Sequence, residues 1–193
     1  KMFDSQLIDP NKVKNNSGQP FKVFTPYSKK IRALLIPEIL QEEPEPLKQN
    51  IKITDEDEIP LFNDTYDKEF NFSIDNYPVT EKSAANRLEK FIETSISNYK
   101  ELRDIPSLSS TSNLSSSFAI GLITSKQAIN QVFSSSDGTG TGQFAWVNEI
   151  IWREFYKYIT YHYPHVSKGK SFNPKYDLIS WREDEDSFIK WCE

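Results

Sequence analysis

One carboxylate, one guanidinium and three aromatic rings share an arc of the stretch from residue 146 to residue 156. At about 100° per residue, Trp146, Glu149, Trp152, Arg153 and Tyr156 fall on the same side of a helix. An aromatic ring can stack on a flat ligand, and a carboxylate one turn away can accept hydrogen bonds from that ligand's edge. The pattern predicts a pocket for a planar, polar-edged ligand. The structural alternative is a surface Glu–Arg pair whose aromatic neighbours cover another element.

A second candidate site is a hydroxyl-rich run between residues 107 and 118. Its centre reads Thr111, Ser112, Asn113, Leu114 and Ser115. Hydroxyl groups and free backbone N–H groups at the start of a helix suit a pyrophosphate. Simple low complexity is the alternative interpretation.

Three helices are expected to position these groups. The first covers 80–99 with Thr80 as its N-cap, and the second covers 124–133 with Thr124 as its cap. The third runs from about 143 to 162. Its expected core face consists of Phe144, Val147, Ile151, Phe155, Tyr158 and Ile159. The second helix is expected to bury Ala128, Ile129, Val132 and Phe133. The glycine-containing loop 134–142 lacks the Gly-Lys-Ser/Thr ending of a phosphate loop, so we reject that assignment.

Composition limits the class of protein. The chain has 193 residues and a net charge of −5, but ten acidic residues and three lysines lie in the segment 41–69, so the remainder is slightly basic. No apolar run approaches the ~20 residues that span a membrane. The lone Cys192 fits a reducing compartment, and no His/Cys cluster has metal-ligand spacing.

The stretch 146–156 resembles the substrate-pocket helix of class I cyclobutane-pyrimidine-dimer photolyases, in the photolyase/cryptochrome family. The presence of both Glu149 and Trp152 favours this group. In (6-4) photolyases and animal cryptochromes the first position is typically Gln, and in plant cryptochromes both are typically replaced. The hydroxyl run resembles the family's flavin-phosphate motif, although Asn113 stands where many relatives carry Arg.

The resemblance implies a mainly α fold and an internal part of a longer protein. Residues 1–36 would end an N-terminal α/β antenna domain whose last strand leads to a linker, and the aromatic, β-branched run 21–27 stands there. Residues 37–79 would be an acidic, proline-containing linker. Residues 80–193 would be the first part of an all-helical FAD-binding domain. We expect the chain alone to be inactive.

The resemblance also implies roles for individual residues. Glu149 and Trp152 would be catalytic, and Trp181 would be the outermost member of an electron relay. The structural alternative for Trp181 is a half-buried residue at a domain edge. The cofactor contacts would be Tyr99, Thr111, Ser112, Asn113, Leu114, Ser115, Trp146 and Arg153. The DNA contacts would be Arg103, Glu149, Trp152, Arg153 and Tyr156. From the residues alone, the favoured interpretation is that Tyr99 is a boundary tyrosine and that Arg103 forms a surface pair with Asp104.

The implied function is light-driven splitting of cyclobutane pyrimidine dimers by electron transfer from reduced FAD, which is a carbon–carbon lyase activity. A folate or deazaflavin antenna would accompany FAD in the full protein. The expected partner is dimer-containing DNA, bound by a monomer with no membrane attachment. The location would be nuclear and mitochondrial in a eukaryote, or cytoplasmic in a bacterium. A cryptochrome-type photoreceptor and a non-catalytic DNA-binding segment are the alternatives.

Overall fold

The computed structural model describes residues 6–39, 77–135 and 140–192. Within these ranges every regular element is a helix and no strand is present, which confirms the mainly α class. The longer helices are α1 (Phe24–Ile39), α3 (Glu81–Thr94), α6 (Ser125–Ser135) and α7 (Thr141–His162). The shorter ones are α4 (Tyr99–Leu102), α5 (Ser115–Ile120) and α8 (Glu185–Cys192). Single 3-10 turns are η1 (Pro10–Lys12), η4 (Ile96–Asn98), η5 (Pro164–Lys168) and η6 (Pro174–Leu178).

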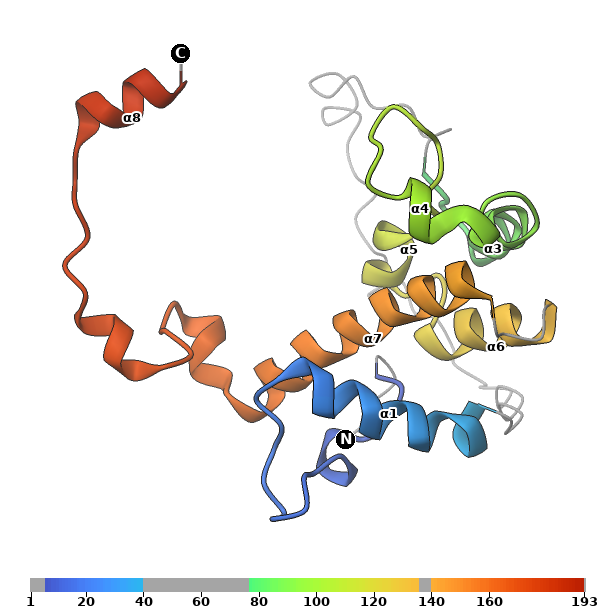
Figure 1. Cartoon of the computed structure of the whole chain (residues 1–193), viewed down its shortest axis with the longest axis horizontal. Helices are drawn as coiled ribbons and strands as arrows, with labels where there is room; N and C mark the ends of the chain where they lie inside the picture. Colours follow the sequence, from blue (N-terminus) through green and yellow to red (C-terminus); the bar gives the residue numbers. More distant parts are fainter. Residues whose placement is uncertain (1–5, 40–76, 136–139, 193) are drawn as a thin grey trace, which may run out of the picture.

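Helix α7 is the axis of the fold. It runs between α1 on one side and α3 and α4 on the other (Figure 1). Its buried side chains include Trp146, Val147, Ile150, Ile151, Phe155 and Tyr158. The expected core face is therefore largely confirmed, but Phe144 is 56% exposed because it lies beside a surface cavity. Trp146, expected on the ligand-facing arc, is instead buried in the core.

Two predicted helix starts have the expected caps. Thr80 and Ser83 form a reciprocal capping box at the start of α3. The hydroxyl of Thr124 accepts a hydrogen bond from the Gln127 amide at 3.1 Å, in front of α6. The first predicted helix, 80–99, is divided in the structure. Helix α3 ends at Thr94, and η4 and α4 follow it as separate elements. On α6, Phe133 is 44% exposed rather than inside.

The N-terminal segment differs most from the expectation. The aromatic run 21–27 is not a strand, because α1 already begins at Phe24 and extends to Ile39, into the predicted linker. The segment before it packs on α7. The Tyr158 hydroxyl donates to the Val13 carbonyl at 2.7 Å and accepts from the Phe21 amide at 3.0 Å. The described part of 1–36 thus joins the same core as α7, while residues 40–76 lie outside the described residues and the domain boundaries stay predictions.

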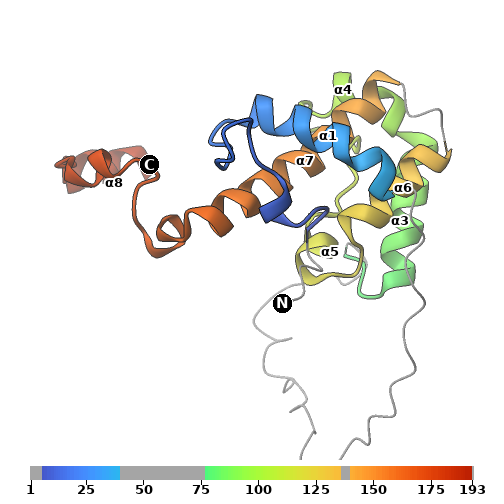
Figure 2. The same cartoon turned by 90° about the horizontal axis from the view of Figure 1, so that it is seen from below.

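Residues after Pro164 form an arm that stands apart from the helical body in both views (Figures 1 and 2). The arm contains η5, η6 and α8. Its large apolar side chains are exposed, with Leu178 at 88%, Trp181 at 79% and Trp191 at 80%. Among the described helices none is long and apolar enough to cross a lipid bilayer.

Candidate functional sites: a hydroxyl-lined pocket and a Glu–Arg cavity

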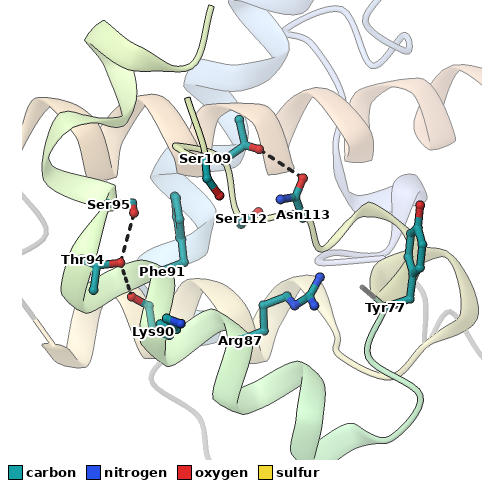
Figure 3. A pocket seen from close by; sticks show the side chains of 10 residues that line it. Tyr77, Arg87, Lys90, Phe91, Thr94, Ser95, Ser109, Ser112 and Asn113 are labelled. Atoms are coloured by element: carbon teal, nitrogen blue, oxygen red, sulfur yellow. Dashed lines mark hydrogen bonds between the residues drawn. The ribbon is translucent and has the colours of Figure 1, made fainter. Parts of the chain in front are cut away.

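The predicted phosphate motif forms one wall of a pocket against α3 (Figure 3). The pocket has a volume of about 500 Å³, and Ser109, Thr111, Ser112 and Asn113 line its loop side. The Thr111 hydroxyl donates to the Asn113 side-chain oxygen at 3.2 Å. Asn113 has φ 51°, in the left-handed region that asparagine tolerates better than most residues. The loop thus presents hydroxyl and amide groups to the pocket, as expected for an anion site.

Leu114 and Ser115 do not line the pocket, whereas the three residues before them do. Leu114 is 1% exposed and anchors the loop in the core. Ser115 begins α5 and is exposed, outside the lining of the pocket. The pocket therefore combines a buried anchor with an open, polar rim.

An aromatic cluster connects this pocket to the core. Phe91, which lines the pocket, lies edge-on to Tyr99 at 5.8 Å and tilted against Trp146 at 5.5 Å between ring centroids. The Trp146 indole N–H donates to the Ser112 hydroxyl at 3.3 Å. Burial raises the pKa of Tyr99, so its hydroxyl stays protonated at neutral pH. The structure thus brings Tyr99, Trp146 and Ser112, all predicted cofactor contacts, into one neighbourhood.

Glu149 and Arg103 meet at a second cavity. Their closest N–O distance is 2.5 Å, and both side chains line a space of about 570 Å³ together with Lys100, Phe144 and Asn148. The hydrogen bond to Glu149 raises the pKa of Arg103. The alternative interpretation from the sequence, a surface pair of Glu149 with Arg153, is not formed, because Arg103 pairs with Glu149 instead.

Helix α1 supports the wall of this second cavity. Arg32 donates to the Asn148 side-chain oxygen at 3.0 Å, and its guanidinium lies 3.9 Å from the centre of the Phe144 ring. Neither interaction was predicted, since the two partners are more than a hundred residues apart in the sequence. Arg32 therefore fixes two side chains that shape the cavity.

Trp152 lies in an aromatic stack rather than in the lining of either pocket. Its ring is parallel to that of Phe24 at 3.4 Å between centroids, and a looser stack joins it to Tyr156 at 5.7 Å. Tyr156 is 62% exposed. The predicted stacking residues are thus neighbours, and part of the Trp152 surface is covered by Phe24.

Arg153 links α7 to α5 and α6 through hydrogen bonds. It donates to Glu154 at 3.0 Å, to the Ser125 hydroxyl at 3.2 Å and to the Phe118 carbonyl at 2.8 Å. Glu154, which sequence reasoning missed, is only 3% exposed and also accepts from Ser125 and from the Leu7 amide. Its spacing of three or four residues from Ile150, Ile151 and Tyr158 places it on the apolar face and was the available signal. These contacts orient Arg153 toward α5 and α6 instead of toward Glu149.

Trp181 is not brought to either pocket, since it belongs to the arm after Pro164 and its side chain is exposed. Two further residues missed by sequence reasoning are Arg87 and Lys90, which line the hydroxyl pocket from α3. Among the described residues there is no group of three His, Cys, Asp or Glu side chains that could hold a metal ion.

Comparison with known proteins gives consistent matches along the chain. Residues 146–193 match the family model described as the FAD binding domain of DNA photolyase. A deoxyribodipyrimidine photo-lyase of Neurospora crassa is 31% identical over 100% of this chain and 34% of its own length. The protein of that name from Escherichia coli is 29% identical over 98% of this chain and 40% of its own length.

A solved structure also matches. The crystal structure of a bacterial class III photolyase from Agrobacterium tumefaciens aligns with a TM-score of 0.68 and 28% identity, covering 97% of this chain and 39% of that protein. The chain therefore spans between about a third and two fifths of the length of these relatives. Over nearly its whole length the chain is thus similar to DNA photolyases, and its residues 146–193 match the FAD binding domain of that family.

Proposed function

We propose that this chain is part of a deoxyribodipyrimidine photo-lyase, a light-driven carbon–carbon lyase that splits cyclobutane pyrimidine dimers in DNA. The observation that carries the proposal is the cavity of about 570 Å³ in which Glu149 is held by Arg103 beside Phe144. A carboxylate of this kind can accept hydrogen bonds from the edge of a flipped pyrimidine. The assignment to class I rests on Glu149 with Trp152 and is part of the proposal.

The substrate would be bound by stacking as well as by hydrogen bonds. Trp152 packs tightly on Phe24 and loosely on Tyr156, and Tyr156 is the more exposed of the two neighbours. A base can displace the exposed ring at a lower cost in buried surface. We therefore assign the Tyr156 side of Trp152 to the pyrimidine, with Arg103 available to a DNA phosphate once Glu149 engages the base.

FAD is the cofactor that the hydroxyl-lined pocket would hold. The pocket fits a phosphate group, because hydroxyl and amide donors line the loop side and no acidic residue is among the described lining residues. Thr111, Ser112 and Asn113 would contact the phosphates, with Leu114 and Ser115 fixing the loop, and Tyr99 and Trp146 would lie near the rings. When bound, FAD would supply the electron that light drives into the dimer. Arg153 would act as a positioning residue, through Glu154 and the Phe118 carbonyl.

The remaining assignments concern the complete protein. Trp181 would be the outer residue of an electron relay, which needs an indole within reach of solvent. A folate or deazaflavin antenna, a monomeric state and dimer-containing DNA as the partner belong to the same proposal. So does an intracellular location, nuclear and mitochondrial in a eukaryote or cytoplasmic in a bacterium.

The test is a repair assay on the complete protein with Trp152→Ala. Loss of a stacking ring should weaken binding to dimer-containing DNA by roughly 1–3 kcal/mol. Binding to undamaged DNA should change little, and loss of dimers under blue light should require FAD. Tyr176→Phe, at an exposed ring of the arm, is the matched control. A complete protein that binds FAD but removes no dimers under light would contradict the repair activity and favour a photoreceptor.

A further inference from the structure

One face of α3 is built from residues that recur at helical spacing. Arg87, Lys90, Phe91 and Thr94 stand at positions i, i+3, i+4 and i+7, so their side chains share one side of the helix. All four line the hydroxyl pocket. Figure 3 shows the Arg87 side chain extended from α3 into the space between this helix and the loop that carries Asn113.

The charge in this pocket has one sign. Arg87 and Lys90 are the ionic residues of its described lining, whereas the opposite wall offers the uncharged groups of Ser109, Thr111 and Ser112. Two cations that line the same space make an anion favourable there. Hydroxyl donors across from them supply the remaining hydrogen bonds that a phosphate oxygen accepts.

The loop itself brings no positive charge. Asn113 stands at the centre of the loop, and its side-chain oxygen accepts a hydrogen bond from Thr111. An amide is a weaker partner for a phosphate than a guanidinium is. Helix α3 therefore carries the cations on the wall opposite an uncharged loop.

We propose that Arg87 and Lys90 bind the pyrophosphate of FAD from α3, supplying the charge that Asn113 does not. The inference rests on the proposed function, because it assigns FAD to this pocket. A guanidinium can form two parallel hydrogen bonds to phosphate oxygens, and an ammonium acts as a compact point charge. FAD should accordingly be held more tightly than riboflavin, which has the same ring system and no phosphate.

The experiment uses the complete protein that contains this chain, stripped of flavin and titrated with FAD or riboflavin. Lys90→Gln should weaken the binding of FAD roughly tenfold, as expected for the loss of one charge-assisted hydrogen bond at an exposed site. The riboflavin affinity should stay within about twofold, and the salt dependence of FAD binding should become shallower. Lys90→Arg should retain the FAD affinity. Lys82→Gln, on the same helix and outside this pocket, is the control.

Arg87→Gln should likewise weaken the binding of FAD and leave the binding of riboflavin unchanged. This difference separates a phosphate contact from a folding defect. Equal weakening of both flavins, or unchanged FAD affinity in both Gln variants, would overturn the inference while leaving FAD as the cofactor. If the unaltered protein bound neither flavin, the proposed function itself would fail, and this inference with it.

Discussion

Arg103, the residue that follows α4, donates to the carboxylate of Glu149 on α7 at 2.5 Å, and both side chains line the same cavity. The pair joins two elements that are 46 residues apart in the chain. Arg103 Nε also lies 3.7 Å from a carboxylate oxygen of Asp104, so both acidic residues of this lining are paired with Arg103. A substrate that takes Glu149 releases Arg103, and this exchange suggests different effects for the two residues.

Arg103→Gln in the complete protein should weaken binding to damaged DNA and to undamaged DNA by similar factors. A phosphate contact carries no sequence or damage information, and its loss should lower the slope of log K against log salt by about one. Titration of both DNAs at several salt concentrations measures this. A loss confined to damaged DNA would instead mean that Arg103 acts through Glu149 in the pocket.

Glu149→Gln should leave the affinity for undamaged DNA unchanged and reduce repair per absorbed photon. The carboxylate matters most when charge develops on the base, and an amide stabilises that charge less well. The quantum yield of dimer loss under saturating DNA is the relevant measurement. An unchanged yield with weaker dimer binding would restrict Glu149 to substrate recognition.

Helix periodicity predicted much of this arrangement, and its failures have identifiable causes. The spacing of Val147, Ile151 and Phe155 identified the buried face of α7, since burial of a stripe requires only local sequence. The true partner of Glu149 was not predicted, because an i,i+4 neighbour such as Arg153 is visible in the sequence whereas Arg103 becomes a neighbour only through tertiary packing. The β-branched run before Tyr27 predicted extended chain, but packing of α1 on α7 overrode that local preference.

The close packing that requires a glycine at the start of α7 was likewise not predicted from the sequence. Gly142 lay in what was expected to be a flexible loop, yet it is a buried residue of the first turn of α7. A Cβ there would overlap the Ile96 carbonyl oxygen and lie 2.7 Å from that of Ser97. The contact between α7 and η4 therefore needs a residue without a side chain.

Gly142→Ala should lower the free energy of unfolding by roughly 1–3 kcal/mol, because the clash is with backbone atoms that cannot rotate away. The sign is informative, since Gly→Ala inside a helix otherwise stabilises by about 1 kcal/mol. Gly140→Ala is the matched control: its Cβ would meet only the side chain of Gln143, which can move. Denaturant unfolding of the complete protein compares the two, and equal stability of both variants would rule out the close approach.

Glu154→Ala should be among the most destabilising changes in the body, by roughly 3–5 kcal/mol, because it removes a buried carboxylate from a charged partner. The Arg153 guanidinium and the Leu7 amide would both lose an acceptor. Glu101→Ala, at an exposed position on α4, should change stability by less than about 1 kcal/mol. Denaturant unfolding tests the pair, and a small effect at Glu154 would show that water replaces the carboxylate.

Trp181→Phe should separate the proposed electron relay from folding and substrate binding. The indole is 79% exposed, so its replacement by another ring removes little buried surface and should leave the unfolding midpoint nearly unchanged. FAD content and dimer binding should also persist. Light-driven reduction of the cofactor by an external thiol should be lost, whereas repair by chemically pre-reduced protein should continue.

Trp191→Phe is the control, because Trp191 lies on the same arm at 80% exposure without an assigned role. Normal photoreduction in the Trp181 variant would remove that residue from the relay.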